Sequence, residues 1–344
     1  MKYSGKIIVL AFPDTFVTMS DEWICRVLPL VGLGTREYIK AGHSAMVLIE
    51  NATGKANYYD FGRYITPKGH GRVRSAETDA ELKIPFKASM DSAGQLTNLD
   101  RFLGWLDAHP EKTHGQGRLL ASVCEAIDYE KAHKHILALQ SRGSIPYGAF
   151  HKQGSNCSRF VTDTILAATD SSEIQRGLNF NKKFTPSTVG NVEKAATDHA
   201  VYEVLQGEVK LFEGTAFKEN LRNYFDKKNP NASNGIAFAE PSDRKPAIGA
   251  HAQYLSGTGS GAWFELSSEQ LPAHHYRIKR YSDSCELDFD GVYVSKEFDA
   301  TLPYQFTYDS HCSYCHVLQN NQKLKLELLA RYAEFNSLQK VHSA

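Results

Sequence analysis

The segment GSNCSRFVTDTIL, residues 154–166, places a cysteine where thiol chemistry is expected. Apolar residues recur after it at helical spacing, at Phe160, Val161, Ile165 and Ala168. This spacing predicts an amphipathic helix that begins near Cys157. A thiol in the first turn of a helix lies beside free backbone N–H groups and the positive end of the helix dipole, which stabilise a thiolate. Cys157 is therefore the candidate nucleophile.

A thiolate nucleophile needs an imidazole base and a polar group that orients the imidazole ring. The chain has 14 histidines, and His43 has the most suggestive position. It opens the segment GHSAMVLIE, residues 42–50, directly after a glycine. The apolar run in this segment predicts a strand that is buried on both faces. A histidine at the end of such a strand can reach a cleft while its backbone stays fixed, so His43 is the candidate base.

The order of these two motifs resembles that of the circularly permuted papain-like enzymes. In that group a histidine strand precedes the cysteine helix, and the group includes PPPDE peptidases, lecithin–retinol acyltransferase relatives and YiiX-like hydrolases. Ordinary papain-like and NlpC-type enzymes have the cysteine first. GSNCSRFVTDTI is similar to the cysteine segment of the permuted enzymes, and GHSAMVLIE followed by YYDFGRY is similar to their histidine strand and its partner. The resemblance covers roughly residues 40–170.

The resemblance implies roles for individual residues. Cys157 would be the nucleophile and His43 the base, and a third residue would lie on the return strand, residues 57–65. A turn centred on Thr53 would set His43 opposite residues 63–64, and Asp60 is the nearest carboxylate on that strand. The backbone N–H of Cys157 would stabilise the oxyanion, and Gln153, four residues upstream, is a candidate second donor.

The chemistry implied is acyl transfer through a thioester on a peptide amide, an isopeptide or an acyl lipid, with no cofactor. Arg72 and Arg74 are two residues apart, so on a strand they share a face. Two guanidinium groups beside a cleft would suit a carboxylate or phosphate of the substrate. The alternative is a solvated strand face, with the arginines paired to nearby acidic residues, which are Glu77, Asp79 and Glu81.

The segment Cys312-Ser-Tyr-Cys315-His316 suggests a zinc site as a rival reading. Cys285, His311 or His316 would supply further ligands. If residues 311–319 form a strand paired with residues 323–329 across the NNQ turn, however, Cys312 and Cys315 point to opposite faces and cannot bind one ion. A turn at this place would reverse that argument, and a second CxxC motif is missing.

The remaining sequence predicts an α+β protein. Strands are expected at residues 6–12, 42–50 and 57–65, and helical spacing at residues 98–110 and 116–142. Segments with the residue pattern of strands return after about residue 246. We expect a permuted papain-like domain over residues 1–199, with an antiparallel sheet on helices, and a β-rich accessory region over residues 200–344.

The composition of the chain limits the classes of binding partner that are expected. Lys and Arg together number 39, as do Asp and Glu, so no overall field favours nucleic acid or an anionic membrane. No stretch approaches the roughly 20 apolar residues of a membrane span. The beginning of the chain, MKYSGKIIVLAFPDTF, has too short an apolar run for a signal peptide, so a cytoplasmic protein with reduced cysteines is expected. The oligomeric state stays open, and the other functional alternative is a non-catalytic binding module on a papain-like scaffold.

Overall fold

The computed structural model describes residues 3–20, 22–183, 185–227, 248–258 and 260–342. The chain divides into two compact units. Unit 1 consists of Met1–Gly62, Gly71–Ala76 and Leu82–Ile236. Unit 2 consists of Arg63–His70, Glu77–Glu81 and Ala237–Ala344. Two short segments of the N-terminal part therefore belong to the same unit as the C-terminal part.

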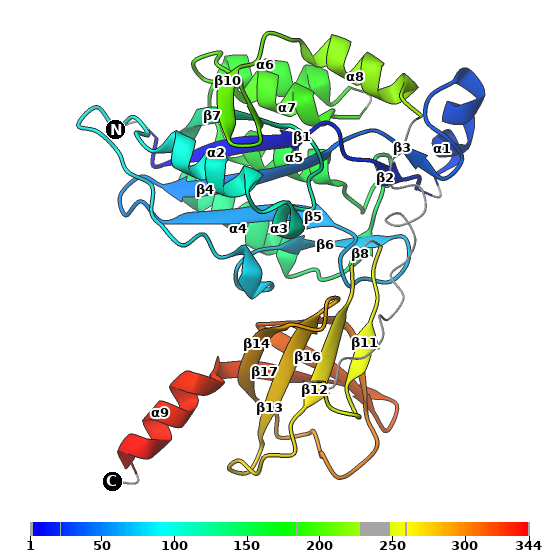
Figure 1. Ribbon diagram of the computed structural model, residues 1–344, viewed down its shortest axis with the longest axis vertical. Coiled ribbons are helices and arrows are strands. Elements are labelled where there is room, and N and C mark those ends of the chain that lie inside the picture. Colours follow the sequence, from blue (N-terminus) through cyan, green and yellow to red (C-terminus); the bar gives the residue numbers. More distant parts are fainter. Residues whose placement is uncertain (1–2, 21, 184, 228–247, 259, 343–344) are drawn as a thin grey trace. The chain divides into compact units, whose positions relative to one another are not determined.

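Unit 1 contains an eight-stranded sheet in the order β10-β9-β7-β1-β4-β5-β6-β8 (Figure 1). Its strands are β1 (Gly5–Phe12), β4 (His43–Glu50), β5 (Ala56–Gly62), β6 (His70–Arg74), β7 (Leu119–Ile127), β8 (Ile145–Pro146), β9 (Tyr202–Leu205) and β10 (Glu208–Leu211). A separate pair is formed by β2 (Val17–Thr18) and β3 (Tyr38–Ile39). The central strand β1 pairs antiparallel with both β4 and β7, and all of its residues are buried.

Helices cover both faces of this sheet (Figure 1). Alternate residues of β1 enter different cores, because successive side chains of a strand point to opposite faces. Ile7 and Val9 pack with residues of α4 (Tyr129–Gln140), α5 (Cys157–Ala168), α6 (Ser172–Asn181) and α7 (Thr188–Ala195). Ile8 and Leu10 pack with residues of α2 (Leu99–Asp107), which is followed by α3 (Pro110–Thr113). The shorter elements are α1 (Trp23–Val27) and the 3₁₀ turns η1 (Leu28–Val31) and η2 (Ala80–Leu82).

Residues 119–127 differ from the helix that the spacing predicted, because they form the buried strand β7. All but Glu125 of its residues are buried. In a segment that is apolar on every side, apolar residues occur at helical spacing by default, so periodicity does not separate a strand from a helix. The predicted helix at residues 98–110 is present as α2 and α3.

The C-terminal boundary of unit 1 also differs from the one predicted at residue 199. Strand β9 pairs antiparallel with β7, and α8 (Ala216–Phe225) packs on α7. Arg118 ties both elements to the sheet, since its guanidinium forms ion pairs with Glu203 at 3.4 Å and with Glu219. Residues 202–225 therefore complete unit 1.

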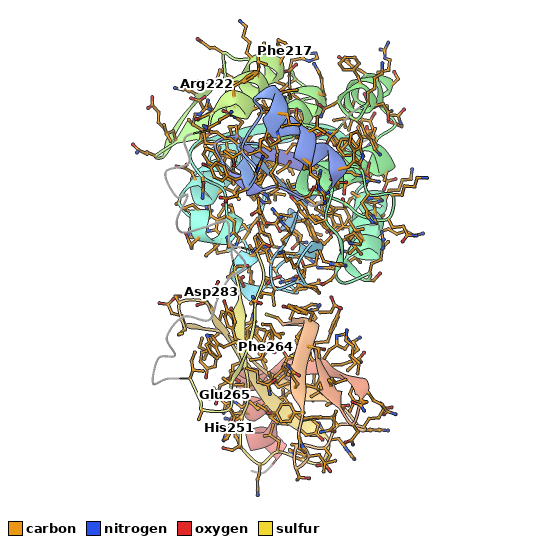
Figure 2. All side chains as sticks on the ribbon, turned by 90° about the vertical axis from the view of Figure 1, so that its right-hand side faces the viewer. Phe217, Arg222, His251, Phe264, Glu265 and Asp283 are labelled. Atoms are coloured by element: carbon orange, nitrogen blue, oxygen red, sulfur yellow. The ribbon has the colours of Figure 1, made fainter. Side chains whose placement is uncertain are left out.

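Unit 2 is built on a seven-stranded antiparallel sheet in the order β11-β12-β13-β14-β17-β16-β15. Its strands are β11 (Gln253–Leu255), β12 (Ala262–Leu266), β13 (His275–Ser282), β14 (Leu287–Val294), β15 (Gln305–His311), β16 (Tyr314–Gln319) and β17 (Gln322–Arg331), and α9 (Tyr332–His342) follows. The side chain of Gln253 accepts from the Phe306 N–H at 2.7 Å and donates to the Tyr304 carbonyl at 3.3 Å. The edge strands β11 and β15 thus meet, and the curved sheet encloses an apolar core that includes Phe264 (Figure 2).

The overall class is α+β with a β-rich C-terminal region, as the sequence predicted. The predicted hairpin is present as β16 and β17, but its first strand begins at Tyr314 and not at residue 311. Cys312 lies in the turn before it, so Cys312 and Cys315 are not on opposite faces of one strand. The turn residues of the hairpin, Asn320 and Asn321, both have positive φ, which asparagine tolerates better than most residues. None of the helices in the described residues combines the length and apolarity needed to cross a bilayer.

Candidate active site

Cys157 is the first residue of α5 and lies next to His43, the first residue of β4. Asn156 is the N-cap of this helix, with extended backbone angles, and its side chain accepts from the Arg159 N–H at 2.8 Å. The first N–H groups of a helix have no intrahelical acceptor, so those of Cys157 and Ser158 remain available beside the thiol. The side chain of Cys157 is 5% exposed and lines a cavity.

His43, on strand β4, contacts Cys157 on helix α5. Gly42 precedes it with a φ of +76°, and an added Cβ there would lie 2.8 Å from the Thr188 hydroxyl, so this turn requires glycine. The imidazole and the Cys157 thiol are hydrogen bonded, and the Ser44 N–H also donates to the sulfur. The structure therefore brings together the two residues that the sequence singled out.

Asp60 is the third member of this chain of contacts. Its Oδ2 lies 3.4 Å from Nε2 of His43. Since Ala45 pairs with Asp60 across β4 and β5, the register differs by one to two residues from the one expected. Residue 43 then lies diagonally across from Asp60 on the same face, within reach of a long side chain. Because Nε2 faces the carboxylate, Nδ1 is the ring nitrogen left for the thiol.

Asp60 is itself held in place by neighbouring side chains. It is fully buried and accepts from Nε of Arg74 at 2.9 Å and from its Nη2 at 2.5 Å. The Tyr58 hydroxyl donates to it at 3.1 Å. A buried carboxylate with this many donors is fixed in one orientation, which in turn fixes the imidazole.

The electrostatics favour charged forms of all three groups. Burial lowers the pKa of His43, but hydrogen bonds with Asp60 and Cys157 outweigh burial and raise the pKa to about 9. Burial raises the pKa of Cys157, but the hydrogen bond and charge of His43 outweigh it, and the pKa of the thiol is lowered. Burial also opposes ionisation of Asp60, yet the charge of Arg74 holds its pKa well below the usual range. These contacts favour a thiolate beside an imidazolium and a carboxylate.

Tyr147 is a site residue that the sequence reasoning missed. Its hydroxyl donates to the Cys157 sulfur at 3.9 Å, a long contact, and its ring stacks on Phe61 with centroids 5.8 Å apart. It lies in the loop SRGSIPYGAFHKQGSN just before the cysteine helix. The signal available was the presence of a hydroxyl donor ten residues before the nucleophile, which by itself has no specificity.

The predicted substrate-binding residues lie elsewhere. Arg74 is 2% exposed and is engaged by Asp60, and Arg72 is 3% exposed. Neither arginine lines the cavity at Cys157, and neither belongs to a solvated strand face. Gln153 is exposed and does not line the cavity either, while its backbone carbonyl accepts from Arg142 at 2.6 Å.

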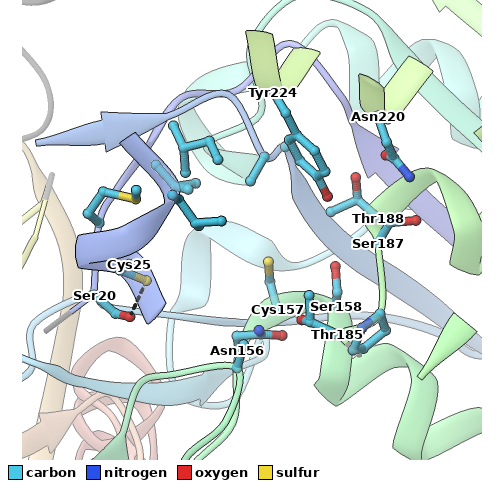
Figure 3. Close-up of a pocket in the computed structure, with 18 of the residues that line it drawn as sticks. Ser20, Cys25, Asn156, Cys157, Ser158, Thr185, Ser187, Thr188, Asn220 and Tyr224 are labelled. Carbon is cyan, nitrogen blue, oxygen red and sulfur yellow. Dashed lines mark hydrogen bonds between the residues drawn. The ribbon is translucent and has the colours of Figure 1, made fainter. Parts of the chain in front are cut away.

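The cavity beside Cys157 has a volume of about 640 Å³. Its lining comes from four parts of unit 1, residues 17–42, 147–158, 181 with 185–188, and 217–224. Figure 3 shows the Cys157 sulfur pointing into it, with Asn156 and Ser158 on the same wall and Tyr224 coming from the opposite wall. The contribution of α8 was not foreseen, because residues beyond 199 were assigned to an accessory region.

The C-terminal cysteines are arranged differently from a metal centre. Cys312 lies in the turn between β15 and β16, and it shares the apolar core of unit 2 with Cys315. Burial raises the pKa of the Cys312 thiol to about 12, and it raises the pKa of the Cys315 thiol as well. Within the described residues, no group of three or more His, Cys, Asp or Glu side chains is placed to hold a metal ion. The zinc reading therefore lacks a ligand set.

Comparison with known proteins adds a family likeness. The model of the family described as "Type VI secretion system effector TseH-like" matches residues 7–174. The model described as "DUF6695 C-terminal domain" matches residues 252–329. The crystal structure of the type VI secretion system effector TseH is 19% identical and covers 62% of this chain and 100% of that chain, with a TM-score of 0.40. No curated protein matches the chain.

The two family matches fall in different units. The TseH-like match spans His43, Asp60 and Cys157 and ends shortly after α5. The second match lies within the sheet of unit 2. The chain is thus similar to TseH-like effectors over the segment that carries the candidate site.

Proposed function

We propose that this protein is a cysteine hydrolase or acyltransferase of the permuted papain-like kind, acting on an amide, isopeptide or ester. The observation that carries the proposal is the continuous contact of Cys157, His43 and Asp60 at the start of a helix that opens into a cavity. A buried, ion-paired thiol beside a cavity is a typical arrangement for nucleophilic catalysis. Structural thiols such as Cys124 have a raised pKa instead, because burial dominates there.

In the proposed reaction the thiolate of Cys157 attacks the carbonyl carbon of the substrate. The N–H groups of the first turn of α5 stabilise the oxyanion that forms. His43 then gives its proton to the leaving amine or alkoxide, and the C–N or C–O bond breaks to leave a thioester. Water, or another acceptor, loses a proton to His43 and attacks the thioester, which restores the thiolate. Asp60 positions the imidazole throughout, since it contacts Nε2.

The direct test measures the alkylation rate of Cys157 against pH. Cys25 is the one partly exposed cysteine and the other five are buried, so a Cys25→Ser background isolates the reaction at Cys157. Intact mass with iodoacetamide is expected to show fast labelling below the pH at which a free thiol, with a pKa of roughly 8.5, reacts. His43→Ala should move this profile to higher pH.

A matched control separates the effect of the imidazole from that of fold damage. His135→Ala removes a half-buried histidine on α4 that does not line the cavity, and it should leave the profile unchanged. Labelling of Cys157 at the rate of a free thiol in both the parent and His43→Ala proteins would contradict the proposal. The non-catalytic binding module would then be the better reading.

The family likeness adds a biological setting to the proposal. The matching family is described as type VI secretion system effectors, and this supports an effector role for the present chain. If the chain is such an effector, its production in a susceptible bacterium should slow growth, and Cys157→Ala should remove the effect. Equal growth inhibition by the parent and Cys157→Ala chains would show that any toxicity does not need the thiol. The cytoplasmic location stays a prediction.

A further inference from the structure

The cavity at Cys157 has few charged groups in its lining. Among the described residues that line it, Glu22 is the one acidic or basic residue apart from the Cys157 thiol. That carboxylate accepts from the Phe150 N–H at 2.7 Å, from the Ala149 N–H at 2.9 Å and from the Ser20 hydroxyl at 3.0 Å. It is therefore used to hold the loop before Cys157. The cavity offers no lysine, arginine or histidine among its described lining residues for a carboxylate or phosphate of a substrate.

Much of the cavity lining is apolar. It includes Leu28, Leu33, Ile39 and Leu221, and the ring of Tyr224 lies across the cavity from Cys157 (Figure 3). A cavity of about 640 Å³ lies within the range of roughly 300–1,000 Å³ that holds small ligands. Its apolar wall gains free energy from covering hydrocarbon, and it gains nothing from a charged group.

The mouth of the cavity is also apolar. Phe217, Leu221 and Phe150 line the cavity and yet are 75%, 47% and 39% exposed. Phe217, on α8, is labelled in Figure 2. Apolar side chains that are this exposed around a cavity mark an interaction site more often than chance placement.

The exposed apolar surface continues beyond the mouth onto α1 and η1. The Gly34 N–H, just after η1, donates to the Tyr224 carbonyl on α8 at 2.9 Å, so the two segments are adjacent. Trp23 and Leu30 on the α1–η1 segment are 71% and 78% exposed. Helices that expose large apolar side chains in this way are suited to the surface of a lipid aggregate.

We propose that the acyl group transferred at Cys157 is a long hydrocarbon chain of a lipid, which enters through the apolar mouth formed by α1, η1 and α8. This inference rests on the proposed function of Cys157. The chain of the lipid occupies the apolar wall, and its ester or amide carbonyl lies at the thiolate. The C–S bond forms as the bond to the lipid alcohol or amine breaks, the leaving group takes the proton of His43, and water releases the fatty acid from the thioester.

The test compares alkylating reagents that differ in chain length. Iodoacetamide and N-dodecyl iodoacetamide are reacted with the full chain in the Cys25→Ser background, and each rate is divided by the rate with N-acetylcysteine. Since burying each methylene is worth roughly a fourfold gain in affinity, the dodecyl reagent should label Cys157 at least tenfold faster on this scale. Leu221→Glu should lower the dodecyl rate at least fivefold more than the iodoacetamide rate. Leu211→Glu makes the same change on β10, outside the cavity lining, and should change neither rate.

The outcomes distinguish the two proposals. Fast labelling by iodoacetamide with no gain from the dodecyl chain would overturn the lipid assignment and leave the nucleophile standing. Slow labelling by both reagents, at the rate of an ordinary thiol, would remove the proposed function itself. An iodoacetylated leucine tripeptide that labels Cys157 as fast as the dodecyl reagent would overturn the lipid assignment in favour of an apolar peptide.

Discussion

The buried ion pair of Asp60 and Arg74 lies directly behind the candidate catalytic imidazole. The two residues are cross-strand partners in β5 and β6, and both side chains are almost fully inaccessible to solvent. Arg74 therefore acts on Cys157 through Asp60 and His43, and does not reach a substrate. Its buried charge makes it a positioning residue with a large effect on the fold.

Arg74→Ala is expected to destabilise unit 1 by about 3–5 kcal/mol, because it leaves the buried carboxylate of Asp60 without its main partner. Urea unfolding followed by circular dichroism measures this change. Arg176→Ala, at an exposed position on α6, is the matched control and should change the unfolding free energy little. If Arg74→Ala kept full stability and only raised the KM for a substrate, the substrate-binding role predicted from the sequence would be right after all.

The pH dependence of turnover should be bell-shaped. On the acid side activity rises as Cys157 ionises, below the usual range of a thiol, because its pKa is lowered by His43. On the alkaline side activity falls as His43 loses its proton near pH 9, since the neutral ring has no proton for the leaving group. Asp60→Asn removes the interaction that raises the His43 pKa, so the alkaline limb should move to lower pH. An alkaline limb unchanged by Asp60→Asn would mean that His43 does not set it.

The nucleophile and the base could be predicted from the sequence, but the residues that hold them in place could not. Cys157 and His43 are marked by local patterns, a helix start and a strand start. Asp60 depended on the register of a hairpin, where an error of one residue moves side chains to the other face. The partner of Asp60, Arg74, lies on the next strand, and Tyr147 lies in a loop. Contacts of that kind depend on tertiary structure, so local periodicity does not contain them.

Helix α5 contributes to the site through its N-terminus as well as through the cysteine itself. The Asn156 side chain satisfies the Arg159 N–H and fixes the first turn, so the remaining N–H groups point toward the thiolate and the oxyanion. The reactivity of Cys157 therefore depends on the order of that turn.

Asn156→Ala should lower the unfolding free energy by about 1 kcal/mol, the usual cost of losing an N-cap. It should also slow the alkylation of Cys157 at neutral pH, because a frayed first turn stabilises the thiolate less. Asp128→Ala removes the N-cap of α4, which accepts from the Lys131 N–H at 3.1 Å, and serves as the comparison. That variant should lose similar stability with no change in the alkylation rate. Equal slowing in both variants would assign the effect to general destabilisation.

Elements with one apolar face were predictable, and so were β1 and β4, whose short continuous apolar runs are typical of buried strands. The alternation of β16 and β17 and the amphipathic character of α5 could be read directly from the sequence. Strand β7 was predicted as a helix, because its buried apolar residues also fall at helical spacing and α4 follows directly after it. Helix α8 was recognised as a helix, but its place over the cavity depends on long-range contacts, such as that of Arg118 with Glu219.

The two units of the molecule are not two consecutive stretches of the chain. Two segments before residue 82 complete unit 2, and they do so with buried contacts. Ile65 lies in the apolar core of unit 2, and the Thr78 carbonyl accepts from the Cys312 N–H at 3.0 Å. Asp79 pairs with the buried Arg280 at 3.1 Å. No composition change or linker marks such an arrangement, so the sequence suggested a single boundary instead.

This interleaving predicts that unit 2 does not fold from its C-terminal residues alone. A fragment of residues 237–344 keeps Asp288 at 3.6 Å from Arg280 but loses Asp79, and it loses Ile65 from the core. Because a buried guanidinium without its close partner is costly, the fragment should show no cooperative thermal unfolding. A longer fragment of residues 200–344 should behave in the same way, since the added strands and helix belong to unit 1. Cooperative unfolding of either fragment at a temperature matching a transition of the full chain would show that residues 63–70 and 77–81 are dispensable for unit 2.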